Sequence, residues 1–459
     1  MAARLLRIFK DTGAVRWAVL LCLALPMFAS YFFDDIFSTI NQEFENPEMV
    51  ALGWSMADYG FYRSAYSLLC IFGGLIVCGM LLDRWGVRLT GSIFVGLMVG
   101  GAALITYAIS EGFAGSSLHR WLSGIFAKPS LSLAYAGCAM FGLGSEIAGV
   151  TVNRAIAKWF KGREIAFAMG LQLALARLGT AVALITVPRI VQLDGYIPYS
   201  ETSKPAVLGL ALLLAGLVLW ALFVAMDYGS DKSRKTGPVQ APSGQDEDRF
   251  RFRDVVKVIT DRHFILISLL CVFFYCCVVS FRKFATAILM PRFGIDSDVA
   301  SVMVAMIPFF TLVFAPLFGA VVDKVGRGTK IMILGSGMIL LAHLAVAFAP
   351  GIPAFGFIAI GVLGLGYSLV PAAMWPSIPK IIAENKLGTA FSLVYWVQNI
   401  GLFTVPIVVG HIIDRADSPI VAEYFFIGLS VCAIVVSILL SRSSDRHPEL
   451  RLDEKAGGR

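Results

Sequence analysis

Two ionisable residues within apolar sequence are the part of this chain best suited to hold a charged molecule. Glu146 lies in an apolar stretch that begins near residue 130, and Arg177 lies in one that ends near residue 188. The basic segment 158–163 (Lys-Trp-Phe-Lys-Gly-Arg) lies about midway between them. If this segment is a turn between antiparallel membrane helices, a rise of about 1.5 Å per residue brings both charges near the middle of a ~30 Å hydrocarbon core. Because charges are costly to bury there, we expect them to face each other or a water-filled cavity and to act in function.

The composition supports a membrane setting for these charges. The chain has 459 residues, of which 58% are hydrophobic and only 15% are charged, far from the values of a soluble domain. A net charge of +7 could indicate a nucleic-acid partner, but the Lys and Arg residues cluster in short segments between apolar stretches. That distribution is typical of a polytopic membrane protein and argues against nucleic-acid binding.

The apolar stretches predict an all-α protein with twelve transmembrane helices. Each stretch is long enough to cross a bilayer once. With the N-terminus in the cytoplasm, the cytoplasmic segments collect about 27 Lys and Arg residues and the opposite side only about 6, so both termini are predicted to be cytoplasmic. The predicted spans are 17–38, 58–82, 89–110, 130–157, 165–188, 206–226, 263–290, 298–322, 330–349, 353–382, 388–413 and 420–441.

One long polar segment, 227–262, divides these spans six and six. We therefore predict an N-terminal half (1–226), a cytoplasmic linker (227–262), a C-terminal half (263–441) and a cytoplasmic tail (442–459). Residues 249–258 alternate basic and apolar side chains, which fits a segment lying along the membrane surface or a solvated connector helix.

The two halves carry a repeated motif. The pattern G-x-x-x-D-[RK]-x-G occurs at 79–86 after the second span and at 319–326 after the eighth. Paired halves with equivalent motifs are typical of transporters built from structural repeats around a central site.

The six-plus-six spans and the paired motifs resemble the major facilitator superfamily over essentially the whole chain. This resemblance implies two pseudo-symmetric six-helix halves. It also implies a gate in which the motif's Asp interacts with the end of a neighbouring helix, a contact worth about 0.3–1 kcal/mol. For Gly86 and Gly326 a turn-forming role is the simpler interpretation. The residues implied in gating are Asp83, Arg84 and Arg88, with Asp323, Lys324 and Arg327 as a second set.

Several stretches further resemble the major facilitator superfamily domain-containing protein 1 group of lysosomal dipeptide carriers. They include G-S-E-I-A at 144–148, G-L-Q-L-A-L-A-R-L-G at 170–179, M-W-P at 374–376 and V-Q-N-I-G-L at 397–402. In that group a Glu, an Arg and a Trp line the peptide site, and the matching residues here are Glu146, Arg177 and Trp375.

The chemistry of a short peptide agrees with the two charges of that set. A peptide zwitterion needs one fixed anion for its ammonium group and one fixed cation for its carboxylate. An Arg can bind a carboxylate with two parallel hydrogen bonds, which a Lys cannot. We expect the C-terminal half to supply an aromatic wall and amides for the peptide backbone. The candidates are Tyr367, Trp375, Tyr395, Trp396, Gln398 and Asn399, with Asn153 extending the site along the helix of Glu146.

Other readings of these charged residues stay open. Glu146 and Arg177 could form a structural ion pair, although such pairs stabilise poorly. Asp34 and Asp35 are read as anchors at the membrane interface in preference to an outer mouth for cations. Arg63 could face the cavity or extend to the interface. His343 and His411 are read as packing or interface residues in preference to a proton relay, and the eight cysteines as buried packing thiols.

Three functions are therefore weighed. The first is a secondary carrier of dipeptides working by alternating access, with Glu146 able also to carry a proton. The second is a carrier of organic anions or drugs that uses Arg177, Arg282 and Lys283; the pair Arg282 and Lys283 is the main departure from what we expect of a dipeptide carrier. The third is a scaffold that transports nothing. No nucleotide loop, metal-spaced cluster or nucleophile motif occurs, so neither an enzyme nor a cofactor is predicted.

The chain contains no N-x-[ST] sequon and no acidic dileucine signal before Leu5-Leu6. We therefore expect a bacterial inner membrane rather than a lysosomal membrane. Separately, we expect a monomer.

Overall fold

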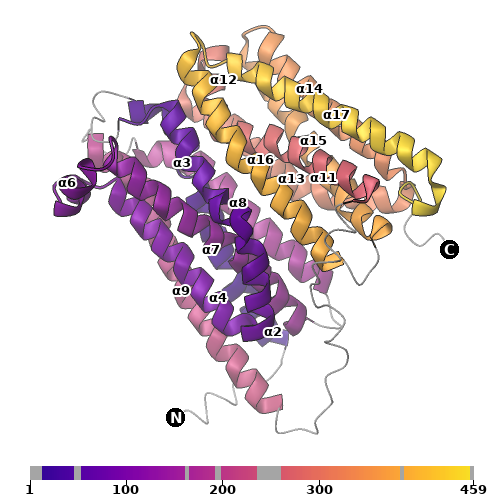
Figure 1. Cartoon of the computed structure of the whole chain (residues 1–459), viewed down its shortest axis with the longest axis horizontal. Coiled ribbons are helices and arrows are strands. Elements are labelled where there is room, and N and C mark those ends of the chain that lie inside the picture. Colours follow the sequence, from indigo (N-terminus) through magenta and orange to yellow (C-terminus); the bar gives the residue numbers. More distant parts are fainter. Residues whose placement is uncertain are drawn as a thin grey trace.

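The computed structural model describes residues 13–45, 53–160, 165–191, 198–234, 260–382 and 387–454, and every regular element in these ranges is a helix. Twelve of the described helices are long and apolar enough to cross a membrane. They form two groups of six that follow each other in sequence, as the colours of Figure 1 show. The predicted fold class is thus confirmed.

The first half contains six spans, two of which are joined through a sharp turn. The second and third spans, Met56–Leu82 and Arg84–Ala108, meet near Gly86, whose φ of 76° only glycine adopts readily. The equivalent turn in the second half contains Gly326 at φ 68°. Both glycines therefore have the positive φ that their predicted role in forming a turn requires. The elements of this half are α2 (Gly13–Asp35), η1 (Asn41–Glu45), α3 (Met56–Leu69), η3 (Cys70–Gly74), α4 (Leu75–Ala108), α5 (Glu111–Ala114), α6 (Ser117–Ser123), α7 (Pro129–Trp159), α8 (Ile165–Val191) and α9 (Pro198–Arg234).

The second half begins with a span that is interrupted near its middle. Two α-helical segments flank a π-helical turn in this seventh span, and five further spans follow. The elements are α11 (Arg262–Tyr275), η4 (Cys276–Ser280), α12 (Phe281–Phe293), α13 (Ser297–Val325), α14 (Gly328–Phe348), α15 (Pro353–Ile381), α16 (Leu387–Arg415), α17 (Val421–Arg446) and η6 (Pro448–Leu450).

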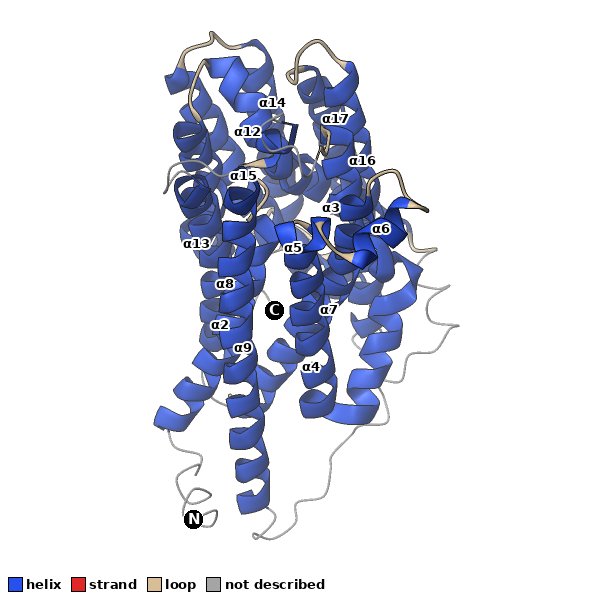
Figure 2. Cartoon of the chain, turned by 90° about the vertical axis from the view of Figure 1, so that its left-hand side faces the viewer, coloured by secondary structure: helices blue, strands red, loops and turns tan. Residues whose placement is uncertain are grey.

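Several segments between the spans differ from the simplest expectation. Helix α9 continues to Arg234, eight residues beyond the predicted end of the first half, and the surface segment predicted at 249–258 lies outside the described residues. The connection between the third and fourth spans contains two short helices, α5 and α6, and α6 projects from the side of the bundle in Figure 2.

Residues after α17 fold back onto the second half instead of leaving it. The side chain of Asp453 accepts hydrogen bonds from the backbone N–H and the hydroxyl of Thr329, at 2.8 Å each. Lys380 donates to the carbonyl oxygens of Arg451 and Leu452, and the Leu452 side chain is buried in the main hydrophobic core. This segment, residues 447–454, is called the docked tail below.

The two halves pack against each other through two pairs of helices, α3 with α16 and α8 with α13. We call the membrane face where α2 begins and α17 ends the terminal face, and the opposite face the far face. At the far face the backbones approach very closely, because a Cβ added at Gly60 would lie 2.1 Å from the carbonyl oxygen of Pro406. A Cβ at Gly410 would lie 2.3 Å from the carbonyl oxygen of Met56. The halves are therefore closed against each other on the far side.

Candidate functional site

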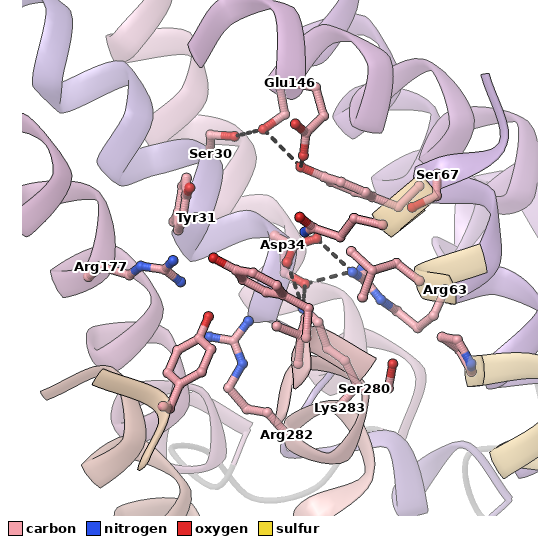
Figure 3. Close-up of a pocket in the computed structure, with 18 residues that line it drawn as sticks. Ser30, Tyr31, Asp34, Arg63, Ser67, Glu146, Arg177, Ser280, Arg282 and Lys283 are labelled. Atoms are coloured by element: carbon pink, nitrogen blue, oxygen red, sulfur yellow. Dashed lines mark hydrogen bonds and ion pairs between the residues drawn. The ribbon is translucent and has the colours of Figure 1, made fainter. Parts of the chain in front are cut away.

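A cavity of about 140 Å³ lies between the two halves near the middle of the helices (Figure 3). Seven of the twelve spans contribute to its wall, and that wall combines charged, hydroxyl and aromatic side chains. A dry cavity of about 150 Å³ can hold a benzene molecule, so this space is suited to a small solute. The lining residues are Ser30, Tyr31, Asp34, Arg63, Tyr66, Ser67, Ser145, Glu146, Arg177, Tyr275, Val279, Ser280, Arg282, Lys283, Tyr367, Gln398, Leu402 and Pro406.

Helical spacing explains which side chains reach the cavity. In α16, Gln398, Leu402 and Pro406 are four residues apart and share one face. In the seventh span, Tyr275 comes directly before the π-helical turn η4, Val279 lies within it and Arg282 follows it. Such turns leave backbone groups outside the regular ladder and often occur at functional sites.

Glu146 and Arg177 lie near the middle of α7 and α8 and line the same cavity, but they do not bind each other. The Glu146 carboxylate accepts a hydrogen bond from the Tyr66 hydroxyl at 3.0 Å. The Arg177 guanidinium lies 5.6 Å from the ring centre of Tyr31 and 5.8 Å from that of Tyr367, both within cation–π range. The Arg177 Nε atom is buried and has no hydrogen-bond partner among the described residues. One carboxylate and one guanidinium thus stand apart on the cavity wall.

The aromatic residues predicted for the second half divide into two layers. Tyr367 and Gln398 line the cavity directly. Trp375 lies behind Tyr275 and donates its indole N–H to the Tyr275 hydroxyl at 3.2 Å. Tyr395 stacks on Trp375 with ring centres 5.1 Å apart. Trp375 therefore supports a lining residue and is not itself in the wall.

Three further predicted site residues also lie outside the cavity wall. Asn153 is exposed, and Asn399 is buried and donates to the backbone carbonyl of Tyr395 at 3.0 Å. Trp396 donates its indole N–H to the carbonyl oxygen of Ile71 at 2.7 Å, which joins the two halves. Ile71 lies in η3, where the helix is broken, so Trp396 binds a carbonyl in a stretch where the regular helical ladder is interrupted.

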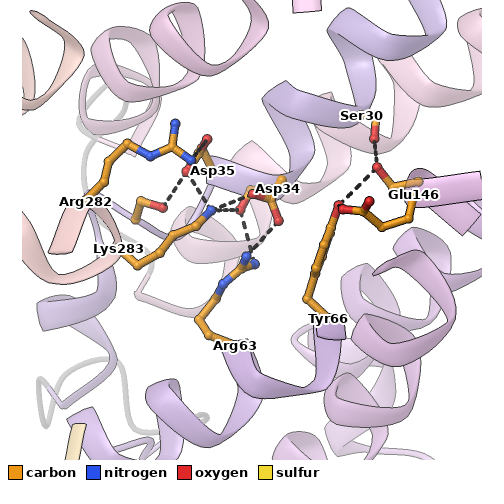
Figure 4. Close-up of polar contacts among 10 residues, drawn as sticks. Ser30, Asp34, Asp35, Arg63, Tyr66, Glu146, Arg282 and Lys283 are labelled. Carbon is orange, nitrogen blue, oxygen red and sulfur yellow. Dashed lines mark hydrogen bonds and ion pairs between the residues drawn. The ribbon is translucent and has the colours of Figure 1, made fainter. Parts of the chain in front are cut away.

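Five charged residues from both halves form a buried group beside the cavity, which we call the charge cluster (Figure 4). Asp34 binds Arg63 at 2.7 Å and Lys283 at 2.6 Å. Asp35 binds Lys283 at 2.7 Å and Arg282 at 3.3 Å. The cluster joins α2 and α3 of the first half to α12 of the second.

The charge cluster corrects one prediction and decides between the two readings of Arg63. Asp34 and Asp35 are not anchors at the membrane interface, since Asp35 is fully buried and Asp34 lines the cavity. Of the two readings left open for Arg63, the structure shows the first: it lines the cavity and pairs with Asp34 inside the protein. The second half also contributes two charges to the cavity wall, Arg282 and Lys283, the residues that the anion-carrier hypothesis uses.

Neighbouring hydrogen bonds close the far side of the cavity. Asn41 donates to the carbonyl oxygen of Lys283 at 2.8 Å, and Thr286 donates to the carbonyl oxygen of Ser38 at 3.1 Å. Together with the charge cluster, these contacts bind the end of α2 to α12 between the cavity and the far face.

The predicted gate residues occupy two different settings. Arg88 binds Asp227 at 2.6 Å and also contacts Asp231, both on α9. Lys158 and the indole N–H of Trp159 bind the same Asp227 carboxylate, each at 2.8 Å. Arg88 therefore belongs to an ion network within the first half. Arg84, Asp323, Lys324 and Arg327 are exposed, and the side chain of Asp83 lies outside the described structure.

Two smaller predictions are wrong. His343 is not a simple packing residue, because its Nδ1 atom lies 2.8 Å from a carboxylate oxygen of Glu423, and both side chains are fully buried. Seven cysteines are buried as expected, but Cys432 is exposed.

Sequence reasoning missed several lining residues. Tyr66 holds Glu146, and Ser30 bonds Ser145 at 2.7 Å beside it, while Tyr275 separates Trp375 from the cavity. A usable signal existed for Tyr66, since it follows Arg63 by three residues and so shares its helix face.

Twelve membrane helices form two halves that close on one side around a central polar cavity, which is the architecture of a membrane transporter. The chain matches the Major Facilitator Superfamily profile over residues 19–282 and 268–458, so it belongs to that superfamily.

Among curated proteins, the chain is similar to lysosomal dipeptide transporters. It is 28% identical to "Lysosomal dipeptide transporter MFSD1" of Homo sapiens over 441 residues, covering 94% of this chain and 87% of the relative. It is 30% identical to the Gallus gallus protein of the same name over 324 residues, covering 68% and 71% of the two chains. The resemblance seen in the sequence motifs is therefore confirmed.

Solved structures share the fold at low identity. A bacterial homologue of the human lysosomal transporter Spinster, in an inward-facing and occupied conformation, superposes with a TM-score of 0.67 at 15% identity and covers 94% of this chain and 98% of its own. The xylose transporter XylE from E. coli, in a partially occluded inward-open conformation, gives a TM-score of 0.67 at 14% identity with the same coverage.

Proposed function

We propose that this transporter carries dipeptides or other short peptides by alternating access. The observation that supports this most is the pair Glu146 and Arg177, which line one cavity without binding each other. A peptide zwitterion supplies the missing partner for each, with its ammonium group at Glu146 and its carboxylate at Arg177. The similarity to lysosomal dipeptide transporters points to the same class of substrate.

In this proposal the protein holds both charges ready for the ligand. The Tyr66 hydroxyl keeps the Glu146 carboxylate in place, and the rings of Tyr31 and Tyr367 hold the Arg177 guanidinium between them. Such preorganisation lowers the entropy cost of binding. Gln398 is available for the peptide amide, and the ring of Tyr275 forms an apolar wall for a side chain.

We also propose the orientation and the cellular setting of the carrier. The terminal face carries most Lys and Arg residues outside the membrane, which favours its placement in the cytoplasm. The structure then corresponds to a state closed toward the outside. A bacterial inner membrane, a monomeric state and protons as a second partner remain part of the proposal.

The experiment is uptake of a dipeptide into proteoliposomes by wild type, Glu146→Gln and Arg177→Ala. Removing one partner of a buried charge pair in the complex costs about 2–5 kcal/mol, so each variant is expected to lose uptake by more than about tenfold. Both variants should keep the wild-type melting temperature. The amide oxygen introduced by Glu146→Gln can still accept from the Tyr66 hydroxyl, and within the described part of the chain Arg177 makes no ion pair that could be lost.

Two results would contradict the proposal. One is normal peptide uptake by both variants. The other is that both variants unfold, which would mean that the two charges support the fold rather than a ligand.

A further inference from the structure

The charge cluster contains more positive than negative groups. Its acids are Asp34 and Asp35, and its bases are Arg63, Arg282 and Lys283, so three bases face two acids and one positive charge is in excess. A charge buried in the membrane is costly unless it is paired. A negative group brought by a ligand would balance the cluster.

The excess charge is best assigned to Arg282. Arg63 and Lys283 each make a hydrogen-bonded ion pair with Asp34, at 2.7 and 2.6 Å. Asp35 already accepts from Lys283 at 2.7 Å and from Ser38 at 3.0 Å. Arg282 reaches Asp35 only at 3.3 Å, through an oxygen that forms no hydrogen bond among the described residues.

The Arg282 side chain is also well placed to bind a ligand. Only 7% of the residue is exposed, and it lines the cavity together with Arg177. Its Nε atom is buried without a hydrogen-bond partner in the described part of the chain. A guanidinium group has five N–H donors in a planar fork that fits a carboxylate. Figure 3 shows the guanidinium groups of Arg177 and Arg282 both directed toward the middle of the cavity.

We propose that Arg282 is a specificity residue that selects peptides with one acidic side chain. This inference rests on the proposed function: Arg177 binds the terminal carboxylate, Glu146 binds the ammonium group, and Arg282 binds the side-chain carboxylate. A dipeptide with one Asp or Glu carries a net charge of −1, which balances the excess of the cluster. A neutral dipeptide leaves that excess in place.

The test compares two peptides of nearly equal shape, Ala-Glu and Ala-Gln, by their binding constants to the purified full-length protein from thermal shift or calorimetry. We expect wild type to bind Ala-Glu at least about tenfold more tightly, because hydrogen bonds to a charged acceptor are the stronger ones. Glu-Ala against Gln-Ala then tells which peptide position faces Arg282.

Variants identify the residue responsible. Arg282→Gln is expected to bring the ratio of the two constants close to one, because it weakens the binding of Ala-Glu more than that of Ala-Gln. The fold should survive, since Asp35 retains Lys283. Arg282→Lys keeps the charge without the fork and should give an intermediate ratio. Arg262→Gln, an exposed Arg at the start of the same span, is the matched control and should leave the ratio unchanged.

The outcomes separate this inference from the proposed function. If wild type binds Ala-Glu and Ala-Gln equally well, the inference is wrong and dipeptide transport stands. If wild type binds neither peptide, both are wrong. If acetate alone stabilises wild type as much as Ala-Glu does but does not stabilise Arg282→Gln, Arg282 binds a free small anion and the peptide inference is again wrong.

Discussion

Replacing Gly60 by Ala should shift this transporter away from the state closed at its far face. In that state the added Cβ would lie 2.1 Å from the carbonyl oxygen of Pro406 and 2.9 Å from its carbonyl carbon. Real Cβ atoms essentially never approach another heavy atom closer than 3.0 Å, so α3 and α16 would have to separate by nearly 1 Å. The clash involves backbone on both sides, which no rotation of a side chain can relieve. A state with these helices apart would accept the methyl group without cost.

The size of the shift follows from the cost of overpacking. Forcing extra methyl groups into a tight contact costs about 1–3 kcal/mol, which corresponds to a change of about 5- to 150-fold in a two-state equilibrium. Because the cost falls on the closed state alone, the whole penalty appears as a larger population open at the far face.

Labelling of a buried position between the halves measures this population. Ser38 is fully buried, and its carbonyl oxygen binds Thr286 of the other half, so a Ser38→Cys thiol is reachable only when the far face opens. The exposed Cys432 is first changed to Ser. A maleimide that cannot cross membranes should then label the Gly60→Ala protein about 5- to 150-fold faster than its Gly60 parent.

The matched control is Gly96→Ala in α4, where an added Cβ would meet nothing within 4 Å. It should label at the parental rate. The reasoning is refuted if Gly60→Ala also labels at the parental rate while its melting temperature is unchanged, since the close approach of the two helices would then not limit opening.

Two further substitutions test the networks outside the cavity. Asp227→Asn should lower stability by about 1–3 kcal/mol, because the Asp227 side chain is 2% exposed and binds Trp159 and two bases. Asp231→Asn should lower it less, because the Asp231 side chain is 35% exposed. Equal melting temperatures for the two variants would contradict this ranking. Glu423→Ala should lower stability by about 2–5 kcal/mol, because it leaves His343 unpaired beside the space that the Glu423 side chain had filled. Glu423→Gln should cost much less, because its amide oxygen can still accept a hydrogen bond from the ring. Melting curves in which the two variants are equally damaging would show that the charge of Glu423, and not its hydrogen bond, is what matters.

The membrane architecture could be predicted from the sequence because it depends on quantities that the sequence states directly. The length of each apolar stretch gives a span, and the positions of Lys and Arg give the sidedness. Glu146 and Arg177 were found in the same way, since their distance from a shared turn gives their depth. The structure places both residues on the wall of one cavity.

The charge cluster could not be predicted by this reasoning. Asp34 and Lys283 are 249 residues apart in the sequence, and nothing local indicates that their helices meet. Depth alone does not give the direction in which a side chain points, and the π-helical turn η4 changes that direction for every residue after it.

The aromatic candidates in α16 failed for a simpler geometric reason. The predictions took Tyr395, Trp396, Gln398 and Asn399 together, although successive residues of a helix are rotated by about 100° and cannot all face one cavity. Of these four, only Gln398 lies on the cavity face, four residues before Leu402.

The docked tail has a practical consequence for producing this protein. A version shortened to Arg446 would lose the Leu452 side chain from the core and leave the N–H of Thr329 and the ammonium group of Lys380 without their present partners. Affinity handles or fluorescent fusions should therefore be attached after Glu454, and a shortened version is expected to give lower yields in detergent.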